Sequence, residues 1–215
     1  VAGFNYTKIF KKGYLQTTLS NSISDYDIVS YGQRQDTVQF DDKATEREHT
    51  LKTELNYQAN RILNLNFTAG GKLANIKNNV FAKQDTTYAG YIRPDLIFDN
   101  TVNTYKLFGS FNLTSKFLND NLIFNAGFRV DYFDFINLKT YISPRAGVSY
   151  KLTPLTTINA SYGIFYQAPA YLWLASNPIN KNLNDIRSEH FILGFEQLLS
   201  PDFKFTVEAY EKRYK

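Results

Sequence analysis

The chain has 215 residues and a formal net charge of +4, from 24 basic and 20 acidic side chains spread along the sequence. This small, dispersed excess argues against a nucleic-acid partner, which requires a basic patch. The absence of cysteine excludes disulfides, cysteine–zinc sites and cysteine nucleophiles. A mean hydropathy of −0.36 and the lack of any long apolar run exclude membrane-spanning helices. Membrane-spanning strands remain compatible, because only alternate residues of such strands face lipid.

The first segments of the chain read as extended strands. Residues 3–10 form the first of them. In residues 14–31, the spacing by four of Leu15, Leu19 and Ile23 is compatible with a helix. The threonine and serine residues between them favour an extended chain, so we predict a strand here as well.

Strict alternation of apolar and polar side chains recurs in residues 63–70, 122–132 and 157–166. Because successive side chains of a strand point to opposite faces, each segment predicts a strand with one apolar and one polar face. Pro144 interrupts another alternating run. Proline cannot donate to a strand ladder, so we expect Pro144 at a bulge or at the point where pairing begins.

The connections between these segments are alternately short and long. Short connections are expected near residues 11–13, 59–61, 118–121, 152–155 and 199–202, and long ones near residues 32–43, 77–100, 134–140 and 168–187. Short turns at one end of a sheet and long loops at the other are typical of outer-membrane barrels. We therefore predict an all-β chain, an antiparallel meander of about ten long strands that forms part of a transmembrane β-barrel.

The two ends of the chain, residues 3–10 and 204–215, both read as strands, and their outer edges have no partner in the sequence. Unpaired strand edges are not stable in lipid, so closure by further strands or by each other is required. No signal peptide precedes Val1, and we favour a truncated start. Residues 1–215 are accordingly expected to be one partial outer-membrane barrel domain.

The second half of the chain resembles a known family. Residues 141–150, which read Tyr-Ile-Ser-Pro-Arg-Ala-Gly-Val-Ser-Tyr, are similar to the Ser-Pro-Arg strand of TonB-dependent outer-membrane receptors. Further similar stretches follow in the family's order at residues 160–169, 177–178, 188–196 and 207–214. The resemblance covers residues 101–215, whereas the earlier half shares only the hairpin rhythm. One departure is Leu183-Asn184-Asp185-Ile186, where these receptors often have Leu-x-Pro-Glu.

The resemblance implies a barrel of about 22 strands in the bacterial outer membrane, in contact with its lipid and with a plugged lumen. It also implies a plug domain in the same full-length chain and a TonB-type coupling protein that delivers energy through segments absent from this sequence. The cargo would be a scarce small solute, such as a metal chelate or a glycan. In this interpretation the chain supplies roughly ten strands from the middle-to-late barrel.

Two sets of polar and aromatic residues are candidates for function. Loop residues that mix aromatic rings with polar groups, as ligand-binding loops do, are Tyr88, Tyr91, Arg93, Asp95, Tyr171, Trp173, Asn177, Asn180 and Lys181. Alternatively, these loops only cover the barrel mouth and pack on each other. Polar residues expected to face the lumen, and to line the plug or the passage, are Arg129, Asp131, Arg145, Asn159 and Glu196.

Catalytic motifs are absent from the sequence, which has no glycine-rich phosphate loop, serine nucleophile elbow or zinc spacing. The sequence therefore predicts neither an enzyme nor a cofactor or metal site. His49 and His190 lie beside acidic residues at expected strand starts, and we expect them to be solvated rim residues. The carboxylate pairs expected at the wetted rim are Asp25/Asp27, Asp41/Asp42 and Glu46/Glu48.

The leading hypothesis is thus a wall segment of an energy-coupled outer-membrane receptor. The alternative is a passive porin-like channel or a small structural outer-membrane barrel, complete as given. A third class, a soluble carbohydrate-binding sandwich, would have shorter strands of about five or six residues and no difference between the two ends of its sheets.

Overall fold

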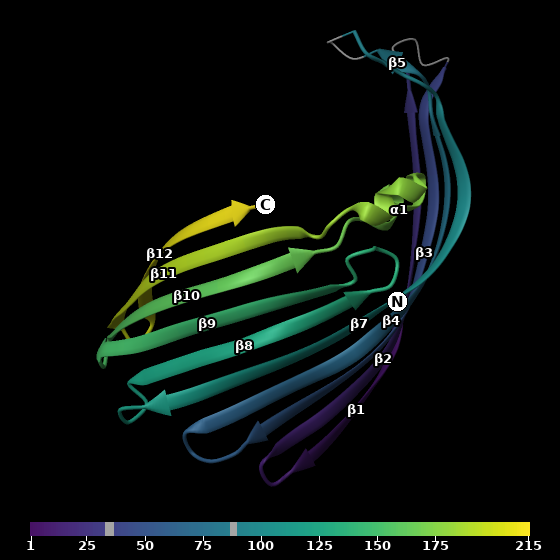
Figure 1. The fold of residues 1–215 in the computed structure, drawn as a ribbon. Helices are drawn as coiled ribbons and strands as arrows, with labels where there is room; N and C mark the ends of the chain where they lie inside the picture. The colour runs from purple at the N-terminus through teal and green to yellow at the C-terminus, as the bar shows by residue number, and fades with distance from the viewer. Residues whose placement is uncertain (33–36, 87–89) are drawn as a thin grey trace.

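The computed structural model describes residues 1–32, 37–86 and 90–215. Ten strands form one antiparallel sheet in which every strand pairs with its neighbour along the chain, in the order β1-β2-β3-β4-β7-β8-β9-β10-β11-β12. The sheet curves into an open trough (Figure 1). Its strands are β1 (Ala2–Phe10), β2 (Gly13–Tyr31), β3 (Val38–Gln58), β4 (Leu63–Ala82), β7 (Leu96–Phe117), β8 (Leu122–Phe133), β9 (Thr140–Thr153), β10 (Thr156–Gln167), β11 (Ile186–Ser200) and β12 (Phe203–Tyr214).

Three small elements complete the fold. Strands β5 (Asp85–Thr86) and β6 (Ile92–Arg93) pair as a separate two-stranded sheet between β4 and β7. Helix α1 (Tyr171–Ser176) and the 3-10 helix η1 (Pro178–Asn182) lie between β10 and β11. No helix in the described part of the chain combines the length and the apolar character needed to cross a membrane. The predicted all-β meander of ten strands is confirmed.

The five predicted short connections are confirmed at one end of the sheet. In the first turn, a Cβ atom on Gly13 would lie 1.9 Å from the carbonyl oxygen of Asn56, so only glycine fits where β2 begins beside β3. In the β7–β8 turn, three successive non-glycine residues, Leu118, Asn119 and Asp120, adopt positive φ values of 52°, 55° and 67°. Asn and Asp tolerate this region better than most residues, which fits their place in a tight turn.

Two of the predicted long connections, residues 32–43 and 77–100, are shorter in the structure than predicted. Strand β3 already begins at Val38, β4 continues to Ala82, and β7 begins at Leu96. The ladder between β4 and β7 runs on through the pairs Asn78↔Asn100 and Val80↔Phe98. Strands β2, β3, β4 and β7 are therefore 19 to 22 residues long, whereas the other strands of the large sheet have 9 to 15.

The long strands project beyond the rest of the sheet as an arm, which we define as residues 22–31, 38–48, 74–82 and 96–104 (Figure 1). Directly paired residues of antiparallel strands share a face. We call the face that carries Leu65 and Phe67 the outer face, and the face on which α1 packs the inner face. Below the arm the outer face is apolar and the inner face is polar.

The apolar parity changes sides in the arm. Along β4 the apolar residues lie on the outer face up to Leu73, and the next apolar positions, Ala74, Ile76 and Val80, lie on the inner face, whereas Phe81 at the end of the strand lies on the outer face. Ile76 is 0% exposed and Val80 is 2% exposed, whereas Leu73 is 63% exposed. No register shift interrupts β4 between these positions, so a single continuous strand carries both patterns.

Apolar side chains gather on the outer face more than in an interior core. Phe67, Phe124 and Val148, all on the outer face below the arm, remain about 40% exposed. A continuous exposed apolar surface of this kind is typical of contact with lipid. The main enclosed cluster contains Phe133, Ile136, Tyr141 and Leu174, where α1 meets the connection between β8 and β9.

Pro144 lies in the middle of β9, opposite Phe128 of β8. Its pairing partners on the other side are missing, because the ladder between β9 and β10 begins only at the next residue, Arg145. The expectation that Pro144 sits where pairing begins is confirmed, and the missing N–H of proline costs no ladder bond to β10 there.

Candidate functional site

The connection from β10 to β11, residues 168–185, forms a strap across the inner face (Figure 1). Its helix α1 packs against β4 and β7. The sequence indicated a loop here and missed both helical turns. One signal was available: Asn177 precedes Pro178, and the Asn177 side chain accepts a hydrogen bond from the backbone N–H of Ile179 at 3.0 Å, which caps η1.

Tyr171 and Leu174 anchor the strap to the sheet. Leu174 is 2% exposed within the cluster around Phe133. The Tyr171 hydroxyl donates to Glu48 Oε1 at 3.2 Å. The Lys106 ammonium lies 4.2 Å from the ring centre of Phe133 and 4.3 Å from that of Tyr171, so one cation is held between two rings. Helix α1 is thereby tied to β3, β7 and the end of β8.

A second anchor joins the strap to the connection between β8 and β9. The backbone N–H of Asn137 donates to the Lys181 carbonyl at 2.8 Å, and its side-chain amide donates to Asn182 Oδ1 at 2.5 Å. The Lys181 ammonium lies 5.5 Å from the ring centre of Phe135. Both ends of the strap are therefore fixed by directional contacts.

A cavity of about 470 Å³ lies between the strap and the inner face below the arm. It combines charged groups with the paired rings of Tyr141 and Tyr166, whose centres are 4.8 Å apart. Most of its cations have an acid partner: Lys72 lies 3.0 Å from Glu48, and the Arg129 guanidinium chelates Asp131 on the same strand at 2.6 to 3.0 Å. Other charged groups on its wall are Lys52, Lys106, Lys139 and Asp185.

Burial controls the protonation of two strap residues. Burial raises the pKa of Asp185 to about 6, against the opposing effect of nearby Lys106. One carboxylate oxygen of Asp185 is buried and has no hydrogen-bond partner. Burial, followed by the charge of Glu48, raises the pKa of Tyr171, so its hydroxyl remains a donor to that carboxylate at neutral pH.

The predicted loop residues divide into two separate places. Tyr171, Trp173, Asn177, Asn180 and Lys181 all belong to the strap. Trp173 is 67% exposed, and its carbonyl accepts a hydrogen bond from the Asn180 side chain at 2.6 Å. The Asn177 side chain also bonds within the strap, to the Ile179 N–H.

The other predicted loop residues lie at the tip of the arm, well above the strap (Figure 1). Arg93 forms a 2.9 Å ion pair with Asp85, and Asp95 accepts a hydrogen bond from the backbone N–H of Gln84 at 2.5 Å. Tyr91 is exposed, and Tyr88 lies outside the described residues. The structure does not bring this set into contact with α1.

Arg129, Asp131, Arg145, Asn159 and Glu196 share the inner face according to the strand register. Asn159 links two of the strands, because it accepts from the Ser149 hydroxyl at 2.6 Å and donates to Glu196 at 2.9 Å. That this face lines a lumen remains a prediction.

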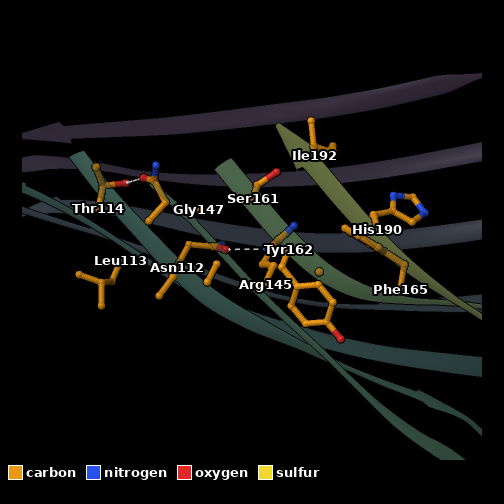
Figure 2. A pocket seen from close by; sticks show the side chains of 14 residues that line it. Asn112, Leu113, Thr114, Arg145, Gly147, Ser161, Tyr162, Phe165, His190 and Ile192 are labelled. Carbon is orange, nitrogen blue, oxygen red and sulfur yellow. Dashed lines mark hydrogen bonds between the residues drawn. The ribbon is translucent and has the colours of Figure 1, made fainter. Parts of the chain in front are cut away.

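A hollow of about 530 Å³ opens on the inner face of β7 to β11, below the strap (Figure 2). Arg145 points into it and donates from Nε to Asn112 Oδ1 at 3.1 Å. The rings of Phe165 and His190 form one side, with centres 4.7 Å apart. At the far side the Thr114 hydroxyl donates to Asn125 at 2.7 Å.

The expectation that the histidines lie at strand starts is not met, and His190 lies in the Arg145 row, away from the rim. His49 lies within β3 on the outer face, and His190 is the fifth residue of β11 on the inner face, half-buried in the hollow. Its Nε2 is 2.8 Å from the Ser188 hydroxyl. The strands simply extend further than the pattern suggested, so residues placed at their starts fall inside the sheet.

The carboxylate pairs lie within the strands of the arm rather than in loops. Asp42 and Glu46 lie on the inner face of the arm, and burial raises the pKa of both side chains. Asp41 is on the opposite face from Asp42. Among residues 1–32, 37–86 and 90–215, no group of three or more His, Asp or Glu side chains is arranged to hold a metal ion.

Comparison with known proteins gives one family. The model of the TonB-dependent receptor-like β-barrel matches residues 2–215. A mutant of the ferric enterobactin receptor PfeA from Pseudomonas aeruginosa has a TM-score of 0.73 at 15% identity, over 99% of this chain and 34% of that one. The copper transporter OprC has a TM-score of 0.70 at 11% identity, over 97% and 37% of the two chains.

The siderophore receptor PiuA from Acinetobacter baumannii is also similar, with a TM-score of 0.58 at 13% identity, over 97% of this chain and 39% of that one. No curated protein sequence matches the chain. The chain thus spans between 34% and 39% of the length of these solved structures.

Proposed function

Since the chain belongs to the TonB-dependent receptor β-barrel family, we propose that it is part of the wall of a receptor for energy-coupled uptake of a small solute. Barrels of this family are bacterial outer-membrane proteins, and the chain is therefore one as well. In the proposed receptor, the full-length chain also contains a plug domain that fills the barrel and a contact for a TonB-type coupling protein.

The observation that carries this proposal is the two-faced sheet. All ten strands are antiparallel, and below the arm they present apolar side chains outward and polar side chains inward. The two edge strands, β1 and β12, have free outer edges. Because lipid offers no hydrogen-bond partners to a strand edge, such a sheet fits an arc of a larger closed barrel.

We propose that the solute binds on the extracellular side, where the long connections lie, at the cavity between the strap and the sheet. The cavity offers paired aromatic rings and charged groups that already have partners. Convergent polar groups on an otherwise enclosed wall are the usual composition of a ligand site. Tyr91, Arg93 and Asp95 at the tip of the arm would meet the solute first.

Uptake in cells that contain the full-length receptor tests the proposal. We expect radiolabelled ferric enterobactin, or radiolabelled copper, to accumulate only when both the receptor and the coupling protein are present. Deletion of the coupling protein should reduce accumulation to the level of cells without the receptor. Accumulation that is unchanged by this deletion would contradict energy coupling.

Conductance separates the receptor from the passive channel. In a planar bilayer, the purified full-length protein should show no steady open conductance, because a plug closes the barrel. Steady conductance that is proportional to salt concentration would instead support a porin-like channel. Recovery of the protein from cells without detergent would support the soluble sandwich.

A further inference from the structure

We propose that the hollow around Arg145 binds an acidic side chain of the plug domain. The inference rests on the proposed function, because it assumes that the full-length receptor has a plug inside the barrel. It adds the place where the plug is held and the charge of the group that is held there. Figure 2 shows Arg145 at the centre of this hollow.

The strand register places Arg145 between two glycines. Arg145 of β9 is paired directly with Gly127 of β8 on one side and with Gly163 of β10 on the other. Neither position has room for a side chain without rearrangement. A Cβ on Gly127 would lie 2.5 Å from the Phe111 carbonyl oxygen, and one on Gly163 would lie 2.8 Å from the Phe165 ring. The guanidinium is therefore flanked on both strands by positions without side chains, which a backbone segment can approach closely.

Arg145 also differs from three other inner-face cations in its partner. Arg129 is chelated by Asp131, Lys72 lies 3.0 Å from Glu48, and Lys204 lies 2.8 Å from Glu196. Arg145 donates to the neutral amide oxygen of Asn112, and among the described residues no carboxylate forms an ion pair with it. The hollow thus holds an uncompensated positive charge.

A domain that fills the barrel would bury this charge. Burial of a guanidinium is unfavourable unless a carboxylate and further hydrogen bonds compensate it. The planar guanidinium matches a carboxylate through two parallel hydrogen bonds, and an amide cannot replace that match. An Asp or Glu side chain is therefore the occupant that the hollow fits best.

The position of the hollow favours the plug over the solute. It lies below the strap cavity, at the level where neighbouring outer-face residues are Ala126, Ala146 and Tyr162. Its flank is formed by the Phe165 ring, the His190 imidazole and Ile192 (Figure 2). Aromatic and aliphatic side chains of this kind are typical of the packed part of a contact between protein surfaces, whereas a passage for a solute does not need them.

Photo-crosslinking in the full-length receptor tests this inference. A photoreactive amino acid replaces Ser161, an inner-face residue that lines the hollow and is paired directly with Gly147. The matched control replaces its neighbour Ala160, which faces the other way. Mass spectrometry should find cross-links from position 161, but not from position 160, to one plug segment that contains Asp or Glu. Cross-links only to the barrel, or to a plug segment without an acid, would overturn the inference.

The charge is tested by hydrogen exchange of the plug segment that the cross-link identifies. Arg145→Ala should accelerate exchange of this segment by roughly tenfold or more, because it leaves a buried carboxylate unpaired. Lys212→Ala is the control, since Lys212 occupies the same inner-face row on β12 but lies outside the hollow. Equal exchange in wild type and Arg145→Ala would contradict the proposal.

A charge exchange completes the test. Arg145→Glu alone should release the plug segment, and combination with replacement of the cross-linked acid by arginine should restore slow exchange. Failure of the double variant to restore it would argue against direct pairing. Energy-coupled uptake, measured in the same cells, tests the proposed function separately. If the plug cross-links elsewhere and uptake is intact, only the binding of the plug at Arg145 is overturned.

Discussion

The arm and the lower wall share strands but carry their apolar side chains on opposite faces of the sheet. In the lower wall, apolar residues such as Phe67 and Val148 point outward and stay exposed. In the arm, Ile76 and Val80 point inward and are buried, while Asn75 and Lys77 point outward. Alternation alone therefore predicts a strand, but the side on which the apolar residues lie reports what surrounds it.

The change of side marks the edge of the apolar environment. It falls between Leu73 and Ala74 in β4 and between Thr104 and Tyr105 in β7, which are neighbouring positions across the ladder. Just below this level, Tyr105 and Tyr132 stack on the outer face with ring centres 5.8 Å apart. Tyrosine is enriched where a barrel leaves the membrane, so these rings agree with a boundary at this row.

The largest effect is expected in the arm. Ile76→Ala removes a side chain that is fully buried on the inner face and should lower the free energy of unfolding by about 2–5 kcal/mol. Lys77→Ala, on the outer face of the same strand, is the matched control and should change little. Urea unfolding of the full-length receptor in lipid vesicles measures both, and equal losses would refute the reversed parity.

The lower wall should respond to charge instead. Arginine in place of Leu65, Phe124 or Val148 should cost about 2–4 kcal/mol if these residues lie near the middle of the bilayer. Arginine at Asn66 or Asn125, on the inner face, should be tolerated far better. The same unfolding assay compares the two faces, and a cost that does not depend on the face would disprove contact with lipid.

The anchor of the strap has a smaller predicted effect. Tyr171→Phe removes the hydroxyl that donates to Glu48 but keeps the ring beside Lys106, so the strap should lose about 1 kcal/mol of stability. Hydrogen exchange of residues 168–185 should become several-fold faster, with no change in β8 to β10. Unchanged exchange in the strap would show that the ring contacts alone hold it.

The smallest effect concerns pH. The pKa of Asp185 is raised to about 6 from an unfolded value near 3.8, so the docked strap binds a proton more readily than the free strap. Docking is therefore favoured at low pH and weakens as the pH rises from about 4 through about 6. After division by the intrinsic exchange rate of each amide, which rises with pH, exchange of the strap should be slower at pH 5 than at pH 7, and Asp185→Asn should remove most of this difference. A strap that is better protected at pH 7 would contradict the raised pKa.

Much of the fold followed from the sequence, because period-two alternation and turn residues are local signals. The short turns and the position of Pro144 are examples. The arm was missed because its polar and apolar residues alternate in reversed phase, and asparagine-rich stretches such as residues 75–79 read as loop. The polar inner-face set was found by parity alone, and its five residues do share one face.

The site depended on information that local patterns lack. That Gly127 and Gly163 flank Arg145 follows from the register of three strands, and no feature near residue 145 specifies it. His190 was misplaced because the start of β11 was set too late. The helical turn of the strap forms through contacts with Phe133 and Glu48, which are distant in the sequence.

The unbroken ladder of β3, β4 and β7 has a mechanical consequence. Hydrogen-bonded pairs continue from the turns to the tip of the arm without a register shift, so these strands contain no flexible joint at the membrane surface. Bending the arm there would break bonds in neighbouring strands at once. If a cargo is enclosed at this side, as proposed above, the unbroken ladder assigns the movement to the strap rather than to β3, β4 and β7.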